Sequence, residues 1–366
     1  MSTPLLSGNL PAPPGGAPAT EPIAVDTRPL SPNQRAWLRF KRNRLGHIAL
    51  WVFVGMLLFS TLAELVANDR PFVARVNGQW YLPMINSPSD RQLGGDFDTP
   101  VDWHDPFIRA TLAKPGNFAL FTLIDHSAGS VNNFALEADP ARPDASHWLG
   151  TDESGRDLLA RLIYGFRISI WFGFALMLTG IVIGVLAGAV QGYFAGRIDL
   201  AGQRFIEIWN SVPELYLLII FASIFQPSIM LLLVLLSLFG WVSLSDYVRA
   251  EFLRNRGLEF VKAARALGLS NWQIIWRHVL PNSMTPVITF LPFRMSAAIL
   301  ALTSLDFLGL GVPSPTPSLG DLLRQGKENL DAWWITVPTF ALLVLTLLLL
   351  TLIGDALRDA FDTRKS

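Results

Sequence analysis

Six long apolar segments alternate with polar segments along the chain. They lie at about 45–63, 166–194, 206–225, 229–247, 286–310 and 334–354. A helix needs about 20 apolar residues to cross the hydrocarbon core of a bilayer. The pattern therefore predicts an all-α membrane protein with six transmembrane helices.

A long polar segment of mixed composition separates the first two apolar segments. Residues 67–160 contain Pro, Asp, Gly and aromatic residues, which predicts a small domain or an elaborated loop. The runs around Arg75–Tyr81 and Asn117–Ile124 are candidate strands. The remaining chain divides into a disordered tail at 1–34, a basic segment with the first transmembrane helix at 35–66, a transmembrane core at 161–357 and a C-terminal tail at 358–366.

Basic residues predict on which side of the membrane each connection lies. The segment 249–277 and the C-terminal tail are basic, and a further cluster directly precedes the first apolar segment. That cluster consists of Arg35, Arg39, Lys41, Arg42 and Arg44. Lys and Arg accumulate in cytoplasmic loops of membrane proteins. We therefore expect both termini and the 249–277 segment in the cytoplasm, and the 67–160 insertion on the outer side.

Composition agrees with a membrane protein and excludes several other classes. Of the 366 residues, 51% are hydrophobic and only 16% are charged, whereas soluble proteins carry about 25% charged residues. The formal net charge is zero, and no clustered basic face indicates nucleic-acid binding. The chain contains no cysteine, which excludes disulfides and thiol chemistry.

The few histidines give no recognisable metal-binding or catalytic motif. His104 and His126 lie near Asp102, Asp105 and Asp125 in the sequence, but without a known ligand spacing. We expect these histidines to be solvated loop residues, and we expect neither a metal site nor a catalytic residue. An intramembrane hydrolase would also need a nucleophile with a base, or a metal motif, and neither is recognisable.

Glycines recur every fourth residue in the second apolar segment. They are Gly180, Gly184, Gly188, Gly192 and Gly196. On a helix this spacing gives one slowly drifting face, and small residues on such a face let two membrane helices approach closely. We predict a tight helix–helix contact. The alternative is the general tolerance of membrane helices for glycine.

The segment between the fourth and fifth apolar runs predicts two short helices joined at a glycine. Leu258–Leu267 suits a helix with Phe260, Val261, Ala264 and Leu267 on one face. Gly268 can end that helix in the left-handed conformation. Ser270 and Gln273 form a capping box that starts the second helix, and Pro281 is expected to end it.

These two helices would form a protruding knob (residues 258–281). Small side chains at Ala263 and Ala264 keep one surface of the knob thin enough to enter a groove on a partner. The alternative is an amphipathic segment that lies on the lipid surface.

The knob resembles the EAA loop of ABC importer permeases. The family pattern is Glu-Ala-Ala, three residues, Gly, nine residues, Ile, one residue and Leu-Pro, and the matching residues here are Ala263, Ala264, Gly268, Leu280 and Pro281. Lys262 stands at the Glu position of the pattern and His278 at the Ile position. Any role that depends on the Glu carboxylate of the pattern is therefore not expected in this chain. The stretches 147–165, 307–323 and 352–364 are similar to the dipeptide/oligopeptide branch of the family.

The resemblance implies a type I ABC importer permease in a bacterial inner membrane. It implies a heterodimer with a second permease, separate ABC ATPase subunits that contact the knob, and a periplasmic peptide-binding protein. ATP and Mg would bind the ATPase, so we expect no cofactor and no enzymatic activity in this chain. The first long loop resembles permeases associated with microcin C uptake, which implies oligopeptides, microcin C-like peptides included, as cargo.

Ionisable residues within apolar segments are candidates for the translocation pathway because they are expensive in lipid. Arg294 and Asp306 are the main candidates, and Glu207 and Glu214 are weaker ones because Pro213 suggests a helix break nearby. The alternatives for these side chains are snorkelling and structural pairing. A rival function, a secondary transporter or channel without an ATPase, would need an ion site built from broken helices, and no inverted repeat is detectable.

Overall fold

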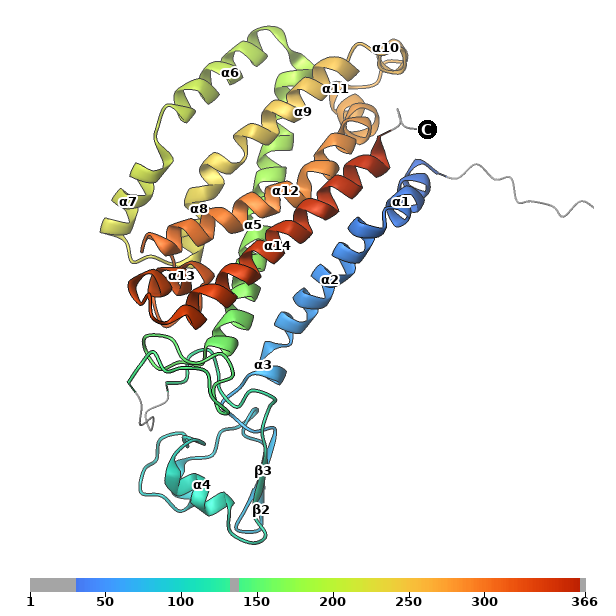
Figure 1. Cartoon of the computed structure of the whole chain (residues 1–366). Coiled ribbons are helices and arrows are strands. Elements are labelled where there is room, and N and C mark those ends of the chain that lie inside the picture. Colours follow the sequence, from blue (N-terminus) through green and yellow to red (C-terminus); the bar gives the residue numbers. More distant parts are fainter. Residues whose placement is uncertain (1–30, 132–137, 363–366) are drawn as a thin grey trace, which may run out of the picture.

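The computed structural model describes residues 31–131 and 138–362, which form a bundle of long helices with a small sheet-containing unit at one end (Figure 1). The helices are α1 (Pro32–Arg42), α2 (Arg44–Thr61), α3 (Ala63–Val66), α4 (Pro106–Leu112), α5 (Leu158–Phe194), α6 (Gly196–Asn210), α7 (Glu214–Ile224), α8 (Ile229–Gly240), α9 (Val242–Asn255), α10 (Glu259–Ala266), α11 (Asn271–Ile274), α12 (Leu280–Phe307), α13 (Leu319–Glu328) and α14 (Trp333–Phe361). The strands are β1 (Val73–Val76), β2 (Gln79–Tyr81) and β3 (Phe118–Leu120).

The bundle contains five continuous spans and one broken span. Long apolar helices cover Arg44–Thr61, Leu158–Phe194, Ile229–Asn255, Asn271–Phe307 and Trp333–Phe361. The helices α6 and α7 are bent by 60° relative to each other. The bend lies at Pro213, where the sequence predicted a break. Together α6 and α7 carry the chain from the end of α5 to the start of α8 (Figure 1), which completes the predicted six crossings.

Both described ends of the chain lie at the same end of the bundle as α10 and α11 (Figure 1). There α1 packs against the last turns of α14: Phe40 is buried with Ala356 and Ala360, and Arg39 donates to the Asp362 carbonyl at 3.1 Å. The tail predicted for 1–34 falls largely outside the described residues, but 32–34 already belong to α1. The predicted C-terminal tail begins as helix, because α14 continues to Phe361.

The small unit at the opposite end is a three-stranded antiparallel sheet in the order β2-β1-β3, accompanied by α4. The candidate strand around Arg75–Tyr81 is instead a hairpin of β1 and β2 that begins at Val73, whereas the candidate strand around Asn117–Ile124 contains β3. Asn77 and Gly78 both have positive φ angles, of 53° and 83°, which suits the tight turn of a two-residue hairpin. Trp103, Leu93 and Ile108 are buried in the core of the unit. The insertion therefore has a hydrophobic core of its own.

Candidate functional site

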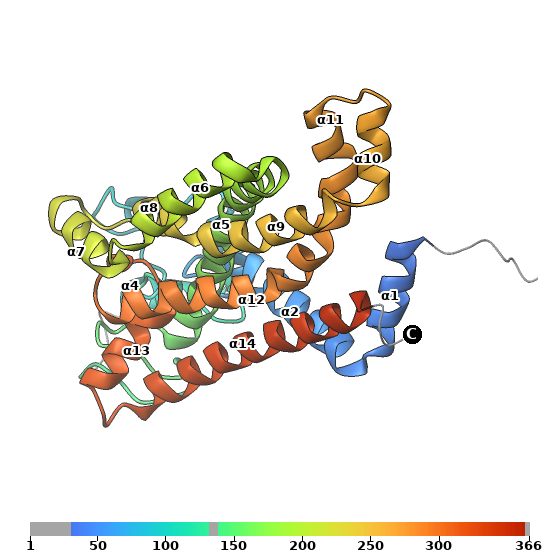
Figure 2. The same ribbon diagram turned by 90° about the horizontal axis from the view of Figure 1, so that it is seen from above.

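The knob (residues 258–281) consists of α10, α11, the turn between them and the helical turn after α11, and its helices α10 and α11 project beyond the bundle (Figure 2). Gly268 has a φ of 78°, a left-handed conformation that favours glycine. The Ser270 hydroxyl accepts from the Gln273 amide at 3.3 Å, and the Gln273 side chain accepts from the Ser270 amide at 2.9 Å. These two bonds form the predicted capping box. The hinge and the start of the second helix are thus as the sequence predicted.

The end predicted for the second helix is wrong. Instead of stopping at Pro281, the chain continues through a π-helical turn at Ile275–Val279 directly into α12. Proline lacks an amide hydrogen and its ring collides with the carbonyl of the fourth preceding residue in a regular α-helix. The wider π-helical turn changes that bonding, since Leu280 donates to the carbonyl of Ile275 five residues back. The knob is therefore continuous with a transmembrane helix.

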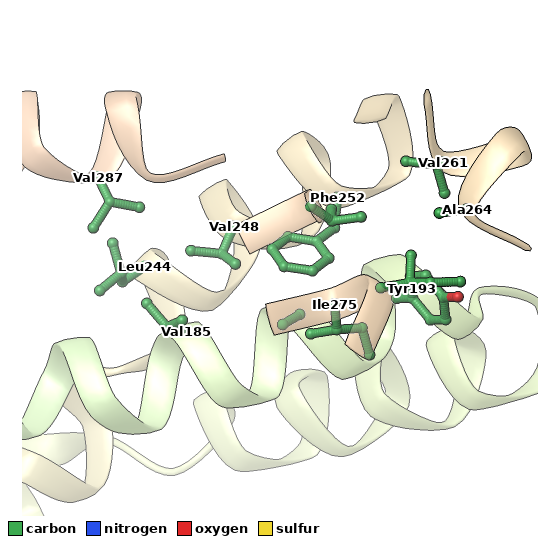
Figure 3. Packing of buried hydrophobic residues seen from close by; sticks show 12 residues of the cluster. Val185, Tyr193, Leu244, Val248, Phe252, Val261, Ala264, Ile275 and Val287 are labelled. Carbon is green, nitrogen blue, oxygen red and sulfur yellow. The ribbon is translucent and has the colours of Figure 1, made fainter. Parts of the chain in front are cut away.

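One face of α10 packs onto the rest of the protein. Val261 and Ala264 are buried beside Tyr193, Phe252 and Ile275 (Figure 3). The Tyr193 hydroxyl also donates to Asn271 Oδ1 at 2.9 Å, which joins the end of α5 to α11. The inward face of the knob is thus an extension of the bundle core.

Other side chains of the knob are exposed, and several of these are large and apolar. Leu267 is 81% exposed, and Trp272 and Trp276 are about half exposed. Lys262 is exposed and forms an ion pair with Glu259 at 2.8 Å. Exposed apolar residues inside a polar rim are typical of protein interfaces. We call Leu267, Trp272 and Trp276 the outer patch.

The structure divides the predicted coupling residues between these two surfaces. Ala264 is buried, so it is part of the support of the knob. Leu280 is half-buried against the same core. Those exposed at the surface are Lys262, Ala263, Gly268 and Pro281. The predicted shared face is divided too, since Val261 and Ala264 point inward whereas Phe260 and Leu267 are exposed. The sequence did not single out Trp272 and Trp276.

Four of the five predicted packing glycines face a neighbouring helix: Gly184, Gly188 and Gly192 place α5 against the start and the length of α9, and Gly180 faces the end of α8. A Cβ atom would lie 2.8 Å from the Trp241 carbonyl oxygen at Gly184 and 2.4 Å from the Ser245 carbonyl oxygen at Gly188. At Gly180 and Gly192 the nearest atoms are the carbonyl oxygen of Gly240 and Cβ of Phe252. Gly196 lies outside the contact and instead begins α6 with a positive φ of 58°.

We expect Gly188→Ala to destabilise the folded chain by about 1–3 kcal/mol, because overpacking forces two backbones apart. Gly55→Ala is the matched control, since nothing lies within 4 Å of the added methyl group on α2. There alanine improves helix propensity by about 1 kcal/mol. Thermal unfolding of the purified variants measures the difference. Equal stability of the two variants would contradict a tight α5–α9 contact.

Arg294 and Glu214 line one hollow within the bundle. This hollow of about 180 Å³ lies between α5, α7, α8 and α12, with Leu236 and Phe239 among its walls. Arg294 donates to Ser243 Oγ at 2.5 Å and to the Gly240 carbonyl. Within the described part of the chain no ion pair joins Arg294 to Glu214. Sequence reasoning ranked Glu214 low, and its proximity to Arg294 depends on the bend at Pro213.

The other two ionisable candidates have local partners. Asp306 is 5% exposed and accepts from the Val312 amide at 2.8 Å and from the Ser318 hydroxyl. It thereby fastens the loop after α12 to the start of α13. These contacts favour the structural alternative for Asp306, and its pathway role stays a prediction. Glu207 is exposed and pairs with Arg204 at 2.5 Å on α6.

A buried ion network joins the two family-like stretches 147–165 and 307–323. Arg161 is completely buried, and its guanidinium lies 3.1 Å from the Asp152 carboxylate and 3.6 Å from the Asp321 carboxylate. Arg156 bonds to Asp152 at 2.9 Å and donates to Ser314 Oγ at 3.0 Å. Stretches more than 140 residues apart in sequence are thus held together beside the start of α5.

The expectation that His104 and His126 are solvated is wrong for His126, whereas His104 is partly exposed. His126 is 6% exposed and His147 is 3% exposed. The rings of His104, His126 and His147 stack in one column, with centroids 4.5 and 4.3 Å apart. Burial, together with the charges of the neighbouring histidines, lowers the pKa of His126 to about 4. The His104 side chain, Arg109 and His126 together hold the pKa of Asp125 well below its usual range, despite its partial burial.

Comparison with known proteins gives matches over nearly the whole chain. Residues 180–366 match the family described as binding-protein-dependent transport system inner membrane component, and residues 31–88 match the N-terminal TM domain of oligopeptide transport permease C. The chain is 47% identical to the inner membrane ABC transporter permease protein YejE of Escherichia coli, over 92% of this chain and 99% of that protein. It is 42% identical to the peptidoglycan transport system permease protein YejE of Agrobacterium fabrum, over 95% and 97% of the two chains. It is 31% identical to the dipeptide transport system permease protein DppC of Lactococcus lactis, over 96% and 95%.

Proposed function

Because this chain belongs to the family of binding-protein-dependent transport system inner membrane components, as an ABC transporter permease of the peptide branch, we propose that it forms half of an ATP-driven uptake pathway for oligopeptides. The observation that carries this proposal is the knob, whose outer patch extends beyond the bundle and whose helix runs on into α12. Microcin C-like peptides are included in the proposed cargo. The proposed partners are a second permease, ABC ATPase subunits and a periplasmic peptide-binding protein.

The continuity of the knob with α12 suggests how ATP hydrolysis acts on the pathway. The helix α12 follows the knob without a break and also carries Arg294, at the hollow, with Pro286 and Pro292 between the two. Movement of the knob by a docked ATPase would therefore move Arg294 and the walls around it. In this account α10 and α11 lie in the cytoplasm, as do both termini.

The charges in the hollow suit a peptide. A peptide has an amine and a carboxylate, and the hollow presents Glu214 from α7 and Arg294 from α12. Its volume of about 180 Å³ is below the roughly 300–1,000 Å³ of complete ligand sites. The second permease would supply the other half of the cavity.

Uptake of a labelled oligopeptide into vesicles tests this function. The vesicles contain the chain together with the proposed partner permease, ATPase and binding protein. We expect uptake that requires ATP and all four components. Arg294→Gln should lower uptake about 10- to 100-fold, as expected for loss of a charge-assisted hydrogen bond. Arg204→Gln, on the exposed surface of α6, is the control and should be neutral.

One outcome would contradict the proposed function, and a second would contradict only the role of Arg294. Uptake by the chain alone, driven by an ion gradient without ATP, would favour a secondary transporter. Equal uptake by the Arg294→Gln and Arg204→Gln variants would remove Arg294 from the pathway while leaving the ATP-driven mechanism intact.

A further inference from the structure

The histidine column connects three separate segments outside the bundle. His104 lies just before α4, His126 follows β3, and His147 precedes α5. At the end of the column His147 Nδ1 is 2.9 Å from Asp157. Asp157 in turn accepts from the Ala160 amide at 2.8 Å and caps α5. The column thus runs from the sheet-containing unit to the first turn of α5.

At the other end of the column, three donor groups face one another without bonding. His126 Nε2 lies 3.5 Å from Asp125 Oδ1, and His104 Nε2 lies 3.7 Å from Asp125 Oδ2. His104 Nε2 is buried and has no hydrogen-bond partner. These separations are too long for good hydrogen bonds, and a buried unpartnered nitrogen is costly.

The same separations suit ligands of a metal ion. One donor atom from each of His104, Asp125 and His126 lies within 4.8 Å of the other two. Nitrogen and oxygen ligands about 2.0–2.1 Å from a tetrahedral zinc ion are roughly 3.3 Å apart. The gap of 3.5 Å between Asp125 Oδ1 and His126 Nε2 therefore exceeds an ideal tetrahedral edge by only a few tenths of an ångström.

We propose that His104, Asp125 and His126 bind a divalent first-row transition-metal ion such as Zn²⁺. A site with two imidazoles and one carboxylate favours such ions over Mg²⁺ or Ca²⁺. A hollow of about 270 Å³, lined by His104, His126, Asp69 and Asp102, lies beside these ligands. Water in this hollow supplies the fourth ligand.

The surroundings orient the ligands. Arg109 donates to Asp125 Oδ2 at 2.8 Å, which fixes the carboxylate and leaves Oδ1 directed toward His126. His147 stacks on the His126 ring from the other side. Such outer contacts hold metal ligands in position. The bound ion joins the segment before α4 to the segment after β3, and the column extends that connection to α5.

Metal titration of the full-length chain tests the site. The chain is purified in detergent without a polyhistidine tag, stripped with a chelator and titrated with Zn²⁺ by calorimetry and with Co²⁺ by visible absorption. We expect one ion per chain and a Co²⁺ spectrum typical of tetrahedral nitrogen and oxygen ligands. His104→Gln should weaken binding at least tenfold, as should His126→Gln.

His278→Gln is the matched control, because His278 lies in the knob at the far end of the bundle (Figure 1). It should bind the metal like the unaltered chain. If His126→Gln fails to fold, the partly exposed His104 decides the question. Absence of stoichiometric binding, or binding unchanged by His104→Gln, would overturn the proposal. An equal loss on His278→Gln would also overturn it.

Discussion

Replacing Leu267 by aspartate is expected to abolish association with the ATPase while the chain still folds and inserts. Leu267 is 81% exposed at the tip of the knob, so the substitution removes no internal contact. A central apolar anchor of a protein interface contributes about 2 kcal/mol or more, which corresponds to roughly 30-fold weaker binding. Co-purification of the ATPase with the chain in detergent measures the effect, and ATP-driven peptide uptake should fall with it.

Leu330→Asp is the matched control for this result. Leu330 is 82% exposed but lies between α13 and α14, at the end of the bundle opposite the knob (Figure 1). Its substitution should leave ATPase association unchanged. Equal ATPase binding by the two variants would contradict docking through the outer patch. Ala264→Arg is a poorer test, because Ala264 is buried and the variant would disturb the core beneath the knob.

Replacing Asp152 by asparagine is expected to cause the largest loss of stability. The side chain keeps nearly the same size, but the buried guanidinium of Arg161 loses the charge 3.1 Å away. Breaking a buried ion pair by removing one partner costs about 3–5 kcal/mol. Thermal unfolding of the purified chain should show a clearly lower midpoint temperature.

Asp98→Asn is the control for the buried network. Asp98 pairs with Arg91 at 2.6 Å, but both side chains are mostly exposed. Exposed pairs contribute about 0–1 kcal/mol, so this variant should unfold at nearly the original temperature. Similar small shifts for both variants would mean that Asp321 alone compensates Arg161.

The sequence predicted the features that depend on neighbouring residues. Each span follows from a run of apolar residues, and the Gly268 hinge follows from the glycine itself and the Ser270 capping box. In each case the physical cause lies within a few residues along the chain. The packing face of α5 was also predictable, since glycines at every fourth residue lie on one face of a helix by helical geometry alone.

Features that depend on distant contacts were not predictable in this way. The direction of Ala264 depends on Tyr193 and Phe252, which reach the knob from other helices. The histidine column joins positions that are 22 and 21 residues apart in a segment with little regular structure. Pro281 misled the prediction because a π-helical turn accommodated it. Periodicity and composition contain no signal for these arrangements.

Cysteine labelling at the tip of the knob tests the central claim most directly, because the natural chain contains no cysteine. The Leu267→Cys variant is exposed to a membrane-impermeant maleimide in intact cells, in inside-out vesicles, and in such vesicles with the ATPase bound. The account predicts labelling only in inside-out vesicles and strong protection by the ATPase. Labelling from outside intact cells, or labelling that the bound ATPase leaves unchanged, would contradict it.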